Sequence, residues 1–179
     1  MQGTPEVAVL RLGHRPGRDE RMTTHVGLTA RALGADRMIL AGEGASRQDT
    51  VEDITERFGG PFAVETTDSP HALFGGWDGD VVHLTMYGLP VQNVQDDIRT
   101  AFETGTPLLV VVGAGKVPFE VHEAADHNVA VTNQPHSEVA SLAVFLDRLY
   151  EGQELDREWE DTEQVVVPQA TGKRVETDG

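Results

Sequence analysis

The 179-residue sequence has no cysteine, only two lysines and no long apolar run. Without cysteine there can be no disulfide, thiolate metal ligand or cysteine nucleophile. The longest apolar stretch, residues 108–112, is far shorter than the ~20 residues of a membrane-spanning helix, so we expect no membrane association. Because the first residues lack the charged and apolar regions of a secretory signal, we expect a cytoplasmic protein.

Acidic side chains dominate the charge. The sequence has 30 Asp and Glu against 14 Lys and Arg, a formal net charge of −16 at pH 7. Few lysines and many acids are typical of proteins adapted to high salt, where the Debye length falls to ~3 Å and repulsion of a nucleic acid is weak. The first 40 residues carry six arginines and only four acids. This basic segment makes an RNA substrate worth considering.

Short strands and helices alternate along the sequence. Apolar runs predict strands at residues 7–12, 38–41, 61–64, 81–85, 108–112 and 128–131. Helical spacing predicts helices at residues 23–33, 49–58, 94–102, 119–125 and 137–150. Residues 66–79 are expected to be a connection without regular structure. The alternation predicts an α/β domain, a three-layer sandwich with a mainly parallel sheet and the 108–112 strand at its centre.

The chain divides into an α/β domain at residues 1–150 and an acidic C-terminal extension at residues 151–179. Within the extension, residues 165–168 are a candidate edge strand, and a polar tail follows.

Three predicted strand ends carry residues suited to a ligand, at residues 84–88, 113–118 and 132–138. Ligands of open parallel sheets bind beyond the carboxyl ends of the strands. Glycines there let a ligand approach the backbone, and Asn133 and Gln134 offer amide groups suited to a nucleoside. The alternative is that these segments are ordinary turns.

Other ligand motifs are incomplete. The Gly-Ala-Gly-Lys sequence at residues 113–116 has Val110 and Val117 where a P-loop needs glycine and Ser or Thr, and Pro118 where a dinucleotide motif needs glycine. The seven histidines lack paired ligand spacing, so no metal site is indicated. No Gly-x-Ser-x-Gly elbow occurs, and Ser137 is better explained as a helix cap than as a nucleophile.

The helix expected at residues 137–150 is apolar around more than one face. Leu142 and Leu146 lie on one side, and Val144 and Phe145 widen the apolar surface beyond what a one-sided helix needs. Core packing explains this breadth, and burial between subunits is the alternative.

Four sequence blocks follow one another in a fixed order: VLRLGHRP at 9–16, TTHVGLTARA at 23–32, HLTMYG at 83–88 and NQPHSEVA at 133–140. They closely resemble the archaeal tRNA (cytidine(56)-2'-O)-methyltransferases of the SPOUT class, over residues 7–168. The resemblance implies a SPOUT-type fold with a C-terminal trefoil knot, S-adenosylmethionine bound in the knot, tRNA as substrate and a homodimer.

The resemblance also implies roles for individual residues. Arg31 stands where SPOUT ribose methyltransferases place their functional arginine, which implies a catalytic role. The implied cofactor-binding residues are Leu84, Gly113, Ala114, Gly115, Lys116, Val117, Thr132, Asn133, Gln134, Pro135, His136, Ser137, Glu138 and Val139. In the basic segment, Arg15, Arg18 and Arg21 are candidates for RNA phosphate contacts, or they pair with surface acids.

The function expected from this resemblance is transfer of the methyl group of S-adenosylmethionine to the ribose 2'-hydroxyl of cytidine 56 in the T-loop of tRNA. The reaction requires the oxygen to be aligned with the methyl carbon and its proton to be removed. Because an arginine pKa is normally above ~12, Arg31 is expected to orient the ribose and stabilise charge. The alternative is a non-catalytic nucleotide- or RNA-binding module on the same scaffold.

Overall fold

The computed structural model describes residues 5–13, 20–42, 45–113 and 116–177. Its strands are Val7–Leu12 (β1), Arg37–Ala41 (β2), Ala63–Thr67 (β3), Asp80–Pro90 (β4), Leu108–Gly113 (β5), His127–Ala130 (β6), Gln164–Val167 (β7) and Arg174–Thr177 (β8). Its helices are Glu20–Ala32 (α1), Ala45–Phe58 (α2), Pro70–Gly76 (α3), Val91–Glu103 (α4), Phe119–Ala124 (α5) and Glu138–Tyr150 (α6), with a 3-10 turn at Gln153–Asp156 (η1). None of the described helices is long and apolar enough to cross a membrane.

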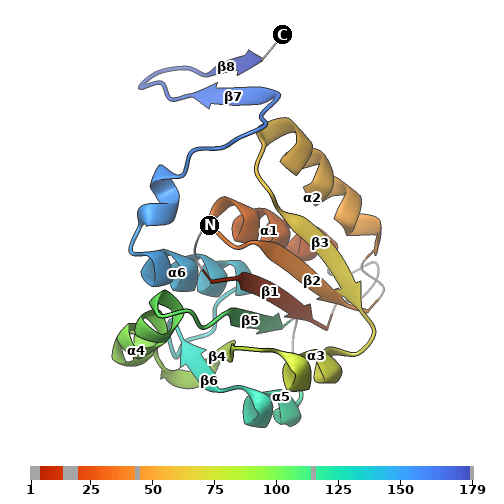
Figure 1. Cartoon of the computed structure of the whole chain (residues 1–179), viewed down its shortest axis with the longest axis vertical. Helices are drawn as coiled ribbons and strands as arrows, with labels where there is room; N and C mark the ends of the chain where they lie inside the picture. The colour runs from red at the N-terminus through yellow and green to blue at the C-terminus, as the bar shows by residue number, and fades with distance from the viewer. Residues whose placement is uncertain (1–4, 14–19, 43–44, 114–115, 178–179) are drawn as a thin grey trace.

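A parallel sheet in the order β3-β2-β1-β5-β4-β6 forms the middle layer, which confirms the predicted architecture (Figure 1). Side chains alternate between its faces, so Val9 and Val110 join the core under α1, α2, α4 and α6, while Leu10 and Val111 join the core under α3 and α5. The apolar strand β5 lies between β1 and β4, and residues 108–112 are buried.

Two elements near residue 65 differ from the prediction. The strand expected at residues 61–64 runs instead at Ala63–Thr67, because its register is fixed by pairing with β2, in which Arg37 lies opposite Ala63. Helix α3 occupies part of the expected connection. It has only seven residues, too few to show helical periodicity, and it packs Leu73 and Phe74 against the sheet.

The apolar breadth of α6 is used mainly inside this chain. Leu142, Phe145, Leu146 and Leu149 are all buried, whereas Val144 is 39% exposed. Core packing therefore accounts for most of the wide apolar surface.

The strand predicted at residues 165–168 is present as β7, but it is not an edge of the main sheet. It pairs antiparallel with β8, which forms from the expected polar tail, and the two strands form a separate sheet beyond the end of α2 (Figure 1). The chain between η1 and β7 returns to the body near α2, where the backbone N–H of Gly60 donates to the carbonyl of Glu160 (3.0 Å).

Strand β4 is irregular where it passes β6. Both Leu84 and Leu89 lie opposite Val129, so residues 85–88 form a loop outside the ladder. A Cβ at Gly88 would come within 2.4 Å of the Asn128 carbonyl group, which means that only glycine allows this approach. The loop is therefore in direct backbone contact with β6.

We expect Gly88→Ala to lower the free energy of unfolding by about 1–3 kcal/mol, because the added methyl group has no space and the backbones must separate. Urea unfolding gives the change. The matched control is Gly75→Ala in α3, where an added Cβ meets nothing within 4 Å. Equal stability of the two variants would contradict the close contact.

Candidate active site

A cavity of about 610 Å³ opens beside the irregular part of β4, the end of β5 and the start of α6. Its walls come from residues 83–87 of β4, from the end of β5, from α5 and from the segment that enters α6. The lining residues are His83, Leu84, Thr85, Met86, Tyr87, Val112, Gly113, Lys116, Val117, Phe119, His122, Pro135, His136, Ser137, Glu138 and Ser141. Residues of all three segments that the sequence predicts to receive a ligand, 84–88, 113–118 and 132–138, therefore meet at this cavity.

Many of the predicted cofactor residues line this cavity. They are Leu84, Gly113, Lys116, Val117, Pro135, His136, Ser137 and Glu138. Thr132, Asn133, Gln134 and Val139 are described but are not part of the lining. Ala114 and Gly115 lie outside the described residues.

Asn133 does not line the cavity, but its side chain binds residues of the cavity wall. Its Nδ2 donates to the carbonyl oxygens of Met86 (2.7 Å) and Gly88 (3.1 Å). The amide thus ties the segment after β6 to the loop at residues 85–88 within β4.

Ser137 caps α6, as its place before a helix predicts. Its Oγ accepts the backbone N–H of Ala140 at 3.2 Å, and Ser137 itself has extended backbone angles. Because the cap also lines the cavity, the N-terminus of α6 points toward the cavity.

A buried ion pair joins β1 to α6 behind the cavity. The Arg11 Nε and Nη2 donate to the two carboxylate oxygens of Glu138 at 3.0 and 3.1 Å, and Nη1 donates to Thr23 Oγ1 at 2.5 Å. Arg11 is completely buried. The sequence did contain a signal for this residue, because an arginine inside an apolar strand needs a buried partner.

His83 is a second residue of the cavity to which the sequence motifs gave no individual role. It is buried in β4, and its Nδ1 lies 3.0 Å from Asn128 Oδ1. The Asn128 Nδ2 donates to the His122 carbonyl at 2.7 Å, so the amide oxygen faces His83 and accepts its N–H. Burial, with a smaller contribution from nearby His122, lowers the pKa of His83 to about 4. The His83 side chain is therefore polar but uncharged at neutral pH.

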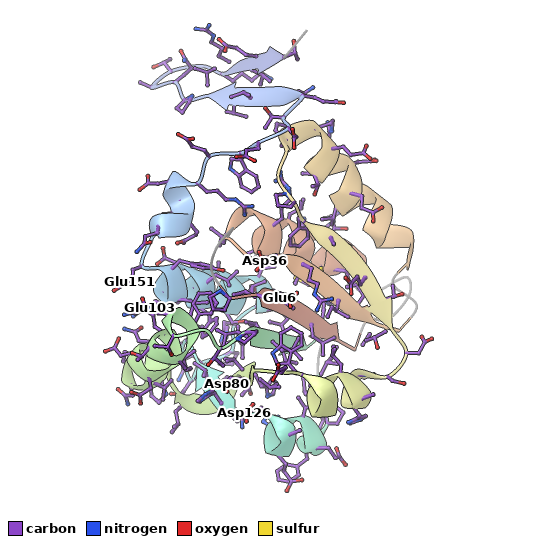
Figure 2. The ribbon with its side chains drawn as sticks, viewed as in Figure 1. Glu6, Asp36, Asp80, Glu103, Asp126 and Glu151 are labelled. Atoms are coloured by element: carbon purple, nitrogen blue, oxygen red, sulfur yellow. The ribbon has the colours of Figure 1, made fainter. Side chains whose placement is uncertain are left out.

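Acids gather at the opposite edge of the sheet. Carboxylates that precede or begin strands, or that end helices, are labelled in Figure 2: Glu6, Asp36, Asp80, Glu103, Asp126 and Glu151. In a parallel α/β fold these positions share the edge where strands start. At the cavity the lining includes one acid, Glu138, which is paired with Arg11, and one of the chain's two lysines, Lys116.

The family model described as tRNA ribose 2'-O-methyltransferase, aTrm56, matches residues 58–176. The chain belongs to this family. A tRNA (cytidine(56)-2'-O)-methyltransferase of Haloarcula marismortui is 70% identical over 98% of this chain and 97% of its own length. The enzymes of the same name from Natronomonas pharaonis and Pyrococcus abyssi are 68% and 52% identical, over 98% and 94% of this chain and 97% and 86% of their own lengths.

Solved structures support the fold. The A. aeolicus TrmH/SpoU tRNA modifying enzyme has a TM-score of 0.58 at 14% identity, over 87% of this chain and 78% of that one. The SpoU methyltransferase AviRb from Streptomyces viridochromogenes, solved with the cofactor AdoMet, has a TM-score of 0.58 at 16% identity, over 84% of this chain and 58% of that one. The expected membership of the tRNA ribose 2'-O-methyltransferase family and the SPOUT-type α/β fold are thus confirmed.

The structure does not bring Arg31 to the cavity. Helix α1 follows β1 and runs back along the sheet, so Arg31, in its last turn, lies toward the edge where strands start. Its Nη2 donates to the Gly59 carbonyl at 2.5 Å, and its guanidinium lies 4.4 Å from the centre of the Trp159 ring. Arg157 lies 4.5 Å from the same ring centre. Burial, and then the charge of Arg157, lower the pKa of Arg31. Its catalytic role in the methyltransferase stays a prediction.

Of the arginines predicted to contact RNA, Arg21 is exposed in the first turn of α1, on the cavity edge of the sheet. Arg15 and Arg18 lie outside the described residues. Their contacts with phosphate also stay predictions.

We expect the His83 site to make folding stability depend on pH. The folded pKa of about 4 lies below the ordinary 6.5, so between these values the unfolded chain binds more protons. Stability therefore falls as the pH drops from 6.5 toward 4. Urea midpoints at several pH values should show a smaller fall for His83→Gln than for the wild type. The control, His71→Gln at an exposed position, should keep the wild-type slope.

We expect Arg31→Ala to lower the free energy of unfolding by about 1–3 kcal/mol, because it removes a buried hydrogen bond and a stacked cation. Trp159→Ala removes the same stacking contact and should act in the same direction. The predicted catalytic role adds a second expectation: methyl transfer per folded molecule should be lost in Arg31→Ala and retained in Trp159→Ala. Retention of methyl transfer by both variants would contradict the catalytic role and leave Arg31 a structural one.

Proposed function

We propose that this chain transfers the methyl group of S-adenosylmethionine to the ribose 2'-hydroxyl of cytidine 56 of tRNA. The observation that carries the proposal is the match over nearly the whole chain to relatives with this activity. The cavity beside residues 83–87 of β4 and the end of β5 is the proposed site of the reaction, because ligands of parallel sheets bind at the edge where the strands end.

The cavity fits S-adenosylmethionine in size and chemistry. Its volume lies within the range of ~300–1,000 Å³ that is usual for small-molecule sites. Leu84, Val112 and Val117 offer an apolar wall suited to an adenine ring. The neutral His83 places no positive charge near a sulfonium, and Glu138 supplies the one carboxylate of the lining. When bound, the cofactor supplies a methyl group that is already activated for transfer.

His136 is the cavity residue best suited to take the hydroxyl proton. Its Nδ1 lies 2.7 Å from the Gln134 carbonyl, an acceptor, so in the neutral ring Nδ1 carries the hydrogen and Nε2 keeps a free lone pair. The other requirement of the reaction is to position the reacting groups. The Arg11–Glu138 pair holds the first turn of α6, and His136 and Ser137 lie directly before this turn.

We propose that the loop at residues 85–88 and the segment at residues 128–134 form the knotted crossing that the family resemblance implies. The close approach of Gly88 to Asn128 and the bonds of Asn133 to this loop support it. We also propose a homodimer and a cytoplasmic location, where tRNA is found. The exposed Val144 on α6 and the exposed valines of the β7–β8 hairpin support contact with a second copy.

Incubation with labelled S-adenosylmethionine and an unmodified tRNA transcript should label one nucleotide, cytidine 56, on its ribose. A transcript with 2'-deoxycytidine at this position keeps the base but lacks the accepting oxygen, so it should take no label. Label at another nucleotide would contradict the proposed substrate position. Binding of both ligands without transfer would support the non-catalytic RNA-binding alternative.

A further inference from the structure

Two aromatic rings stand exposed at the mouth of the cavity. Tyr87 is 80% exposed and Phe119 is 69% exposed, and both line the cavity. His122 lies between them, with ring centres 6.4 Å from Tyr87 and 6.5 Å from Phe119, and its ring is tilted only 25° from that of Phe119. We call Tyr87, Phe119 and His122 the aromatic rim. The packing of the fold does not require Tyr87 or Phe119, because neither ring is covered.

The backbone that carries the aromatic rim is held in place. Tyr87 lies between Met86 and Gly88, whose carbonyl oxygens both accept hydrogen bonds from Asn133. Phe119 is the first residue of α5, directly after Pro118. On its inner side, His122 contacts the buried His83, with ring centres 4.6 Å apart. Rings presented on a fixed backbone lose little conformational freedom when a ligand stacks on them.

The charge around the aromatic rim suits a polyanion. Lys116 is exposed and lines the same cavity, and the Glu138 carboxylate is paired with Arg11. Glu120 and Glu123 of α5 are exposed nearby but do not line the cavity. In a chain with a net charge of −16, a mouth with a lysine and no unpaired acid in its lining is a suitable place for a phosphate.

We propose that Tyr87 and Phe119 form a stacking surface for an unpaired nucleobase of the RNA substrate, with Lys116 facing the adjoining phosphate. This rests on the proposed tRNA methyltransferase function and adds the residues that receive the nucleotide. RNA-binding proteins stack splayed bases on Tyr, Phe and His. The adenine of the cofactor is a less suitable occupant, because the enclosed wall of Leu84, Val112 and Val117 is available to it while both rings face outward.

The test compares Tyr87→Ala and Phe119→Ala with Tyr87→Phe and Phe119→Tyr, which keep a ring at each position. Each alanine variant should raise the Kd for unmodified tRNA about tenfold, a usual effect of losing one stacked base. The ring-keeping variants should stay within twofold of the wild type. Leu155→Ala is the control, because Leu155 is 66% exposed but does not line the cavity. The Kd for S-adenosylmethionine and the melting temperature should not change in any of them.

A second measurement reports stacking directly. A T-loop hairpin RNA with 2-aminopurine next to cytidine 56 should lose fluorescence on binding to the wild type, and lose less on binding to Tyr87→Ala and Phe119→Ala. Unchanged tRNA affinity and quenching in the alanine variants would overturn the proposal. Weaker S-adenosylmethionine binding would assign the rings to the adenine, and dissociation to a monomer in light scattering would assign them to a subunit contact; either result overturns it.

Wild-type methyl transfer, measured on the same tRNA, separates this proposal from the function it rests on. If the wild type methylates cytidine 56 and the alanine variants bind tRNA normally, only the stacking surface is refuted. If the wild type quenches the probe but transfers no methyl group, the stacking surface stands and the catalytic function fails.

Discussion

The pair between Arg11 and Glu138 is the constraint on which the cavity depends. It joins the first strand to the last helix of the main body, across 127 positions of sequence. Arg11 is buried, so loss of Glu138 would leave an unpaired charge inside the protein, at a cost of about 3–5 kcal/mol. With Thr23 bound to the same guanidinium, β1, α1 and α6 are held in one arrangement. The cavity wall therefore has a fixed position before any ligand arrives.

The cavity and a set of structural carboxylates lie at opposite edges of the sheet, which bears on how an acidic protein can receive RNA. The labelled carboxylates lie where strands begin, and some of them have structural roles there, since Asp36 accepts the backbone N–H of Val7 and Asp126 that of Val81, both at 2.8 Å. The cavity edge has Lys116 and the exposed Arg21. At high salt the net charge acts over only a few ångströms, so this local distribution decides the approach of a polyanion more than the total of −16 does.

The sequence predicted the elements that rest on local patterns. The uninterrupted run at residues 108–112 correctly indicated a central strand, and Ser137 correctly indicated a helix start. Helix α3 was missed because its seven residues show no helical period, and the pairing of β7 with β8 was not predicted because no local pattern names the partner of a strand. The strand ends that form the cavity could be predicted, since parallel strands place their carboxyl ends together. The individual contacts, such as that of Arg11 with Glu138, depend on the tertiary fold.

Arg31 shows why a position in a motif does not fix a place in a site. Helix α1 has 13 residues and is therefore about 20 Å long, so its first and last turns reach opposite edges of the sheet. Only the first turns of this helix, which contain Arg21 and Thr23, lie toward the cavity of the same chain. Arg31 is engaged by Gly59 and Trp159 at the far end. A catalytic Arg31 would thus have to act in the cavity of a second copy, and it would first have to leave the tryptophan that now covers it.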